Sequence, residues 1–345
     1  MAIKWYGKKN YVNAIPVFEE LIGLYKGSAK QEEVYYLYCW ANFKQGDYLI
    51  AAYHFKYFTQ LYPNSSRNEE CLYMSAKSNA LQSPKWELDQ TNTYKAIEAY
   101  QQFVNEFPES PRVDSVNDQM RLLRKKLERK ALAAADLYYR TRNFKAAATS
   151  YNNLLKDYPD IDDNERIQYM VVKSTYEFAR NSIPEKKAER YKQVISSYRN
   201  FTYKFNNSKY DAEVRQFEED AHFRTVEAAL EWGQTAPLGE REYALRVMLG
   251  ELDRQKPLIK DEKQLESLEK MREKGHFLKI RYDAEFAETL NPADQGKIYE
   301  RIIKNYYTFV DLFRDSRFFP QAERYFKKAQ NTISKLPPNG QKQKN

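Results

Sequence analysis

The chain has 345 residues, of which 42% are hydrophobic, 30% are charged and only 10 are glycine. A composition this poor in glycine and rich in charge argues against a β-barrel or β-sandwich and favours a soluble all-helical protein. The net charge of +8 is small for this length, and acidic residues are interleaved with basic ones almost everywhere. Nucleic-acid binding is therefore not expected, because it calls for a concentrated basic surface on a recognised fold.

Residues 1–28 predict the end of one helix and the whole of a second. Tyr11, Ala14, Phe18 and Leu21 are spaced 3, 4 and 3 residues apart, which places them on one face of a helix. The chain thus opens inside a helix-pair repeat, whereas an array of repeats normally begins with a capping unit. We therefore expect N-terminal sequence, including any targeting signal, to be missing.

Residues 31–63 are the most regular repeat. A first helix leads to Gly46, and a second helix begins at Tyr48 and ends before Pro63, because the residue before a proline disfavours helical geometry. Ser65 is expected to cap the next helix. The apolar face of the second helix recurs in six copies, whose first members are Tyr11, Tyr48, Ala96, Phe144, Tyr191 and Tyr299.

Residues 66–108 repeat the pattern with a longer turn between the two helices. Tyr73 stands 23 residues before Ala96, whereas Tyr36 stands 15 residues before Ala51, so the insertion is 8 residues long. Asp89 or Thr91 within the inserted loop can cap the second helix. Two further repeats follow at 110–159 and 162–206.

The first helix of the 110–159 repeat is long, from 113 to 139. Its apolar positions are Leu122, Leu123, Leu127, Leu132, Leu137 and Tyr138. The same helix holds the densest basic run of the chain, residues 121–130. That run is either a solvated helix face or a surface that docks an acidic partner or lipid headgroups. In the second case the contact residues are Arg121, Arg124, Lys125 and Arg129.

Residues 1–232 are predicted to form one repeat domain, followed by a linker at 233–240 that is rich in turn-forming residues. Residues 241–336 form a C-terminal helical extension, with helices near 241–253 and 261–289 and the sixth repeat copy. The constant offset of 108 residues between copies five and six predicts an added repeat with a long insertion. Residues 337–345 are predicted to be disordered.

No pattern in the sequence predicts catalysis or a cofactor. The three histidines stand far apart, and there is no metal-ligand spacing, phosphate loop or nucleophile motif. Cys39 and Cys71 lie among apolar residues and are interpreted as small buried side chains. No run of apolar residues is long enough for a membrane span. We therefore expect no cofactor, no metal and no enzymatic activity.

Six in-phase helix pairs predict an all-α fold, a superhelix or solenoid of stacked pairs, because two antiparallel helices cannot bury an apolar face alone. The signature of helix, Gly-x-aromatic, alanine, aromatic and proline resembles the tetratricopeptide repeat. Residues 1 to about 225 resemble more specifically the BamD family, the tetratricopeptide-repeat lipoproteins of the outer-membrane β-barrel assembly machine. The discriminating segments are Leu88-Asp89-Gln90-Thr91 and the long helix with Leu123-Arg124-Lys125-Lys126-Leu127.

The resemblance implies a scaffold at the periplasmic face of the outer membrane, held there by a lipid anchor that this chain lacks. It implies two partners: the periplasmic domains of a BamA-like barrel protein, and unfolded outer-membrane proteins. Tetratricopeptide arrays bind extended peptides along their first helices. By register with the repeat, the candidate groove residues are Tyr36, Trp40, Phe43, Tyr73 and Lys77. The competing interpretation is that Tyr36 and Trp40 pack between repeats.

Two other classes of function stay open at this level. The first is a cytoplasmic tetratricopeptide adaptor or co-chaperone that organises another protein complex. The second is a structural or cell-division coordinator of the periplasm, which would lack the Leu88–Thr91 loop. The resemblance covers about two thirds of the chain, so it implies nothing about residues 226–345.

Overall fold

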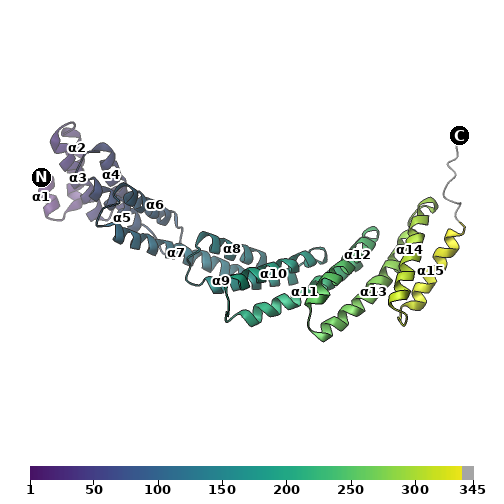
Figure 1. Ribbon diagram of the computed structural model, residues 1–345. Helices are drawn as coiled ribbons and strands as arrows, with labels where there is room; N and C mark the ends of the chain where they lie inside the picture. The colour runs from purple at the N-terminus through teal and green to yellow at the C-terminus, as the bar shows by residue number, and fades with distance from the viewer. Residues whose placement is uncertain (336–345) are drawn as a thin grey trace, which may run out of the picture. The chain divides into compact units, whose positions relative to one another are not determined.

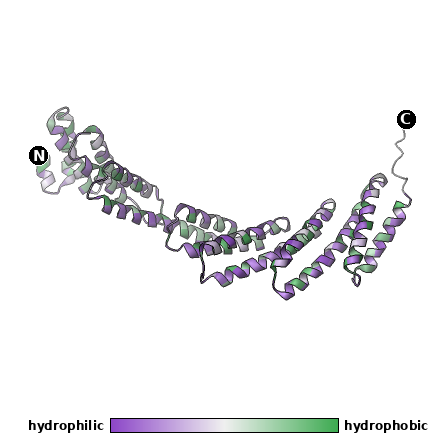
Figure 2. Cartoon of the chain, in the orientation of Figure 1, coloured by the Kyte–Doolittle hydropathy of each residue, from purple (hydrophilic) through white to green (hydrophobic). Residues whose placement is uncertain are grey.

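The computed structural model describes residues 1–335, and within them the chain forms fifteen α-helices, one short 3-10 helix and no strand (Figure 1). The prediction of an all-α chain of helix pairs is confirmed. In Figure 2 the long helices carry both hydrophilic and hydrophobic residues, as expected where one face packs and the other is solvated. Among the described residues, no helix combines the length and the apolar character needed to cross a membrane.

The helices follow one another as antiparallel pairs and a final single helix. Their bounds are α1 (Ala2–Gly7), α2 (Tyr11–Leu24), α3 (Ala29–Gln45), α4 (Tyr48–Leu61), α5 (Asn68–Leu81), α6 (Thr91–Glu106), α7 (Val113–Arg140), α8 (Phe144–Asp157), α9 (Asn164–Arg180), α10 (Pro184–Lys204), α11 (Asp211–Thr235), α12 (Leu238–Gln255), η1 (Lys256–Leu258), α13 (Glu262–Ala287), α14 (Pro292–Leu312) and α15 (Phe319–Ile333).

The contacts divide the chain into two compact units, residues 1–134 and residues from 135 onward, so that the boundary falls within α7. The repeat pattern placed a boundary at residue 232 instead. The limits of the individual repeats, and the single repeat domain over 1–232, stay predictions.

The second helix of each pair fills the core with the predicted residues. In α4, Ala51, Phe55 and Phe58 are completely buried. The repeated alanines at 14, 96 and 147 are equally buried, which allows the neighbouring helices to approach closely. Gly46 ends α3 with a φ of 92°, a left-handed conformation that glycine adopts without steric cost. The periodicity therefore identified the buried face correctly.

Ser65 does not cap α5, contrary to the sequence prediction. The N-cap of α5 is Arg67, and the Ser65 hydroxyl accepts a hydrogen bond from the Arg67 N–H at 3.2 Å. The same hydroxyl donates to Glu32 Oε1 at 2.6 Å, so the turn after α4 is tied to the start of α3. The arrangement recurs where Ser110 donates to Glu69 and Ser316 donates to Glu273.

The long helix α7 buries fewer of its apolar residues than its sequence pattern suggested. Leu123 and Leu127 are buried, but Leu122, Leu137 and Tyr138 are 60%, 52% and 41% exposed. Leu123 packs with α5 and α6 side chains in one hydrophobic cluster. Leu122 precedes it directly in sequence on a different face, so a helix cannot bury both against the same neighbour.

The segment expected to be a linker, 233–240, contains the end of α11, a short turn and the beginning of α12. Gly233 is buried, and a Cβ there would lie 2.8 Å from Leu245 Cδ2, so glycine permits the close approach of the two helices. The offset of 108 residues spans an additional helix pair, α11 and α12, in place of an irregular insertion. The predicted disordered tail lies outside the described residues.

Candidate peptide-binding surface

The five predicted groove residues lie on two successive first helices. Tyr36, Trp40 and Phe43 belong to α3, whereas Tyr73 and Lys77 belong to α5, and all five are half-buried. Tyr36, Trp40 and Phe43 recur at helical spacing, with ring centroids 6.4 and 5.6 Å apart. Tyr36, Trp40, Phe43 and Tyr73 pack against the same hydrophobic cluster, and we call these four residues the aromatic strip.

The inner edges of the aromatic strip pack on the second helices. Trp40 meets the completely buried Phe55 at 5.7 Å, and Tyr36 meets Phe58 at 6.1 Å. Tyr73 meets Phe103 of α6 at 5.8 Å. The interpretation of these rings as packing residues thus describes their inner edges, while their half-buried state leaves the other edges accessible. The groove assignment itself stays a prediction.

Four cations lie over the rings of the aromatic strip. Arg67 lies 4.5 Å from the Tyr36 ring centroid, Lys44 lies 5.4 Å from that of Trp40, and Arg112 and Lys77 lie 5.3 and 5.9 Å from that of Tyr73. Such contacts each contribute about 0.5–1 kcal/mol at exposed sites. Arg67 and Arg112 were missed from the sequence. Their signal is their place two residues after Ser65 and Ser110, which fixes both backbones.

Two carboxylates border the aromatic strip. The Tyr36 hydroxyl donates to Glu70 Oε2 at 2.6 Å, and Arg112 pairs with Glu69 Oε1 at 2.9 Å. Burial, followed by the hydrogen bond to Glu70, raises the pKa of Tyr36 to about 12, so its hydroxyl stays protonated at neutral pH. The surface thus offers ring edges and guanidinium groups together, which suits aromatic side chains and carboxylates.

The basic run of α7 divides into cations that hold a loop and cations on the surface. Lys126 Nζ donates to Ser83 Oγ and to the Pro84 carbonyl at 2.6 and 3.0 Å. Lys130 Nζ donates to the Leu88 carbonyl at 2.6 Å. The predicted docking residue Arg129 lies over the Trp86 ring at 4.7 Å. These three cations therefore fix the inserted loop.

The other predicted docking residues are exposed. Arg121 pairs with Asp118 one turn earlier at 2.6 Å, and both side chains are more than half exposed. Arg124 and Lys125 also lie at the surface. Exposed ion pairs of this kind contribute little to stability, so they exchange readily for a partner's carboxylates. Docking through these residues stays a prediction.

Gln90 organises the Leu88–Thr91 loop from within. Its side chain is 5% exposed, and its amide donates to the carbonyls of Lys85 and Leu88 at 2.8 Å each. Thr93 donates to the amide oxygen of Gln90 at 2.7 Å. Asp89 accepts the Thr91 N–H at 2.9 Å, as the capping prediction required. The loop is therefore a built structure that lies on α7.

The structure shows no metal site within residues 1–335, because no three His, Cys, Asp or Glu side chains are grouped to hold an ion. Cys39 and Cys71 are free and completely buried, as predicted. Burial raises the pKa of both thiols.

Stacked helix pairs that present half-buried aromatic rings along their first helices define a tetratricopeptide-like repeat protein. Residues 2–173 match the model of a family, YfiO, described as outer membrane lipoprotein. This part of the chain belongs to that family.

Two curated relatives are both named outer membrane protein assembly factor BamD. The protein of Pasteurella multocida (strain Pm70) is 27% identical over 161 residues, which cover 44% of this chain and 62% of the relative. The protein of Vibrio cholerae serotype O1 is 25% identical over 162 residues, which cover 44% of this chain and 67% of the relative. The match thus spans less than two thirds of the length of the Pasteurella relative.

Proposed function

We propose that the chain is a non-enzymatic scaffold for the assembly of outer-membrane proteins, working at the periplasmic face of the outer membrane. Membership of an outer membrane lipoprotein family supports this location and attachment through a lipid. The printed names of both relatives support a role in outer-membrane protein assembly. The observation that carries the proposal is the aromatic strip under its four cations, which lies inside the family-matched part of the chain.

The aromatic strip binds an extended, aromatic-rich segment of an unfolded outer-membrane protein. Half-buried rings supply large contact area at low entropic loss, because they are already held by the core. Arg67 and Arg112 add positive charge that suits a terminal carboxylate. The strip therefore provides both parts of such a segment with a partner.

A peptide titration tests the aromatic strip. The probe is a fluorescent peptide with alternating aromatic residues and a free C-terminus, followed by fluorescence anisotropy. We expect Arg67→Gln with Arg112→Gln to weaken binding about tenfold, since charge-assisted contacts contribute about 1.5–3 kcal/mol. Lys56→Gln with Lys95→Gln removes the same charge from exposed positions and should change binding less than twofold.

A second variant separates the groove from packing. Tyr36→Ala with Trp40→Ala should weaken the peptide further while the helix content of the chain, measured by circular dichroism, stays near the wild-type value. If this variant unfolds, the two rings are core residues. If both arginine substitutions leave the affinity unchanged as well, the strip is not the peptide site.

The exposed cations of α7 dock the scaffold on the periplasmic domains of a BamA-like barrel protein. The test is a pull-down with those domains. We expect Arg121→Glu with Arg124→Glu to abolish capture, whereas Lys56→Glu with Lys95→Glu preserves it. Capture that survives the α7 reversal would assign docking to another surface, and recovery of an unrelated complex would favour a tetratricopeptide adaptor.

A further inference from the structure

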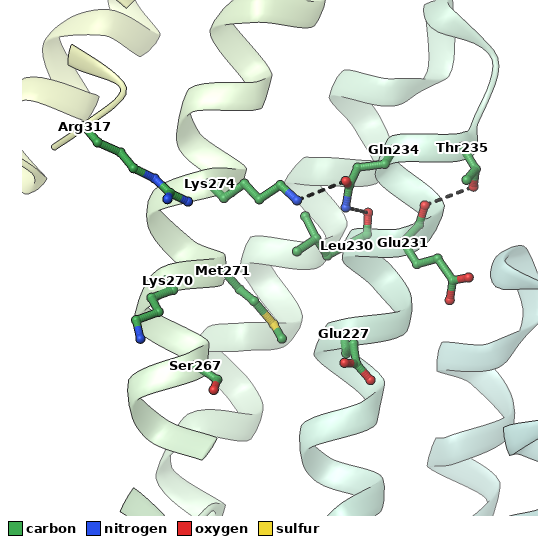
Figure 3. Close-up of a pocket in the computed structure, with 10 residues that line it drawn as sticks. All are labelled: Glu227, Leu230, Glu231, Gln234, Thr235, Ser267, Lys270, Met271, Lys274 and Arg317. Carbon is green, nitrogen blue, oxygen red and sulfur yellow. Dashed lines mark hydrogen bonds between the residues drawn. The ribbon is translucent and has the colours of Figure 1, made fainter. Parts of the chain in front are cut away.

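A cavity of about 570 Å³ lies between α11 and α13, outside the residues that match the family (Figure 3). The turn between α14 and α15 adds Arg317 to its wall. Leu230 of α11 and Met271 of α13 point toward each other across the gap in Figure 3. Leu230 is a member of the main hydrophobic cluster of this unit, and Met271 packs against it. The middle of the cavity is therefore apolar.

The two acidic residues of the cavity are already neutralised by cations of the same or a neighbouring helix. Glu227 pairs with Arg224 at 2.5 Å, and Glu231 pairs with Lys187 of α10 at 2.9 Å. In Figure 3 the carboxylate of Glu231 points away from α13. The acidic wall thus contributes little net negative charge to the gap.

The opposite wall carries three cations that lack strong acidic partners. Lys274 donates to the amide oxygen of Gln234 at 3.1 Å, and it forms no ion pair within the described chain. Arg317 lies 4.8 Å from the Phe318 ring centroid and likewise has no carboxylate partner among residues 1–335. Lys270 pairs with Glu266, but both side chains are about 70% exposed, so this pair is weak.

The spacing of these cations matches an extended peptide. Lys270 and Lys274 are four residues apart on α13, which corresponds to a rise of about 6 Å along the helix. Alternate side chains of an extended chain point to the same side about every 6.6 Å. A row of cations also favours several carboxylates over one. We propose that this cavity binds an extended acidic peptide segment of a partner protein, with acidic side chains at alternate positions and an apolar residue between them.

The apolar residue of the segment lies on Leu230 and Met271, and its flanking carboxylates meet Lys270, Lys274 and Arg317. Binding breaks only the weak Lys270–Glu266 pair and the contact of Lys274 with a neutral amide. The site is independent of the aromatic strip, because its residues all belong to the C-terminal unit.

Isothermal titration calorimetry with the full chain tests the proposal. The probe is a capped nonapeptide with a central Glu-Leu-Glu, compared with the same peptide carrying Gln-Leu-Gln or Glu-Ser-Glu. We expect Glu-Leu-Glu to bind at least tenfold more tightly than either. Lys274→Gln with Arg317→Gln should remove this preference over Gln-Leu-Gln, and Met271→Ser should remove the preference over Glu-Ser-Glu.

The matched control is Lys263→Gln with Arg314→Gln, which removes the same charge from exposed positions on α13 and the turn after α14. It should change the affinity less than twofold, and Arg67→Gln with Arg112→Gln should leave it unaltered. Equal weakening by the control and by the cavity variant would overturn the proposal in favour of unspecific charge attraction. Tighter binding of a free C-terminal carboxylate without internal acids would overturn the alternating-acid pattern.

Discussion

Ala51 shows how much of the repeat depends on a single small side chain. It is completely buried in a cluster that joins α3, α4 and α5, where Tyr35 and Cys39 leave no room for a larger group. The repeated alanine therefore limits the distance between neighbouring helices.

We expect Ala51→Trp to lower the free energy of unfolding by about 1–3 kcal/mol or more, because overpacking a tight contact forces the backbone apart. The measurement is the thermal midpoint of unfolding, followed by circular dichroism. Ala29→Trp, at an exposed position of α3, is the matched control and should have little effect. An unchanged midpoint for Ala51→Trp would show that the helices tolerate separation there.

His222 of α11 is a buried charged residue. Its Nδ1 lies 2.6 Å from Gln255 Oε1, and its Nε2 lies 2.8 Å from Glu218 Oε1. Both partners accept, so both ring nitrogens donate, and only the imidazolium carries two N–H groups. Burial lowers the pKa of His222, but the hydrogen bonds to Glu218 and Gln255 outweigh it and raise the pKa above its ordinary value, against a smaller opposing effect of Arg199 on α10.

A raised folded-state pKa gives a defined dependence on pH. The stabilisation is fully present below the unfolded pKa of about 6.5 and is lost as pH rises through the folded pKa. We expect wild-type α11 and α12 to exchange amide hydrogens more slowly than in His222→Gln at pH 5.5, with the difference shrinking toward pH 8.5. His54→Gln, whose native pKa is lowered chiefly by burial, should not show this trend. A difference that stays constant over this range would contradict a charged His222.

At the scale of the element, each of three repeats is closed by a serine that lies in neither helix. The Ser65 hydroxyl links the backbone after α4 to Glu32 near the beginning of α3. Because the partner is a carboxylate, this hydrogen bond is stronger than one between neutral groups. The sequence pattern recorded the serine but assigned it a local capping role.

We expect Ser65→Ala to cost about 1–2 kcal/mol of stability, because it removes both the donor to Glu32 and the acceptor of the Arg67 N–H. Chemical denaturation of the full chain measures the loss. Ser66→Ala changes the neighbouring exposed serine and should be close to neutral. Equal effects of the two substitutions would mean that the link to Glu32 does not contribute to the folded state.

At the scale of the whole molecule, the C-terminal unit has one continuous core from α11 to α15. Phe223, Val226 and Leu230 of α11 pack in the same cluster as Leu245 and Met248 of α12. A cut inside this segment therefore exposes side chains that the full chain buries, whatever the linker-like composition of 233–240.

We expect a chain that ends at Leu230 to lose hydrogen-exchange protection along α11, because its apolar face no longer has α12 to pack against. A chain that ends at residue 335 keeps all the described helices and serves as the control. Retained protection of α11 after the shorter truncation would show that α10 alone suffices to hold it.

The apolar periodicity and the helix-ending residues were sufficient to predict the class of fold, because both act within a few residues of the chain. Tyr48, Ala51 and Phe55 share a face whatever lies opposite, and Gly46 ends α3 through its own backbone. The aromatic strip was predicted for the same reason, since it repeats in register with those faces.

Partners about 40 residues apart depended on how the helices stack, which no local period records. Arg124 and Lys126 belong to one basic run, yet Arg124 is exposed whereas Lys126 holds the inserted loop, and only the packing of that loop on α7 separates them. Likewise Leu230, Met271 and Arg317 come from three separate segments, and only helix packing gathers them around one cavity. Sequence spacing reports which face is buried, whereas the choice of partner is made by the packed neighbour.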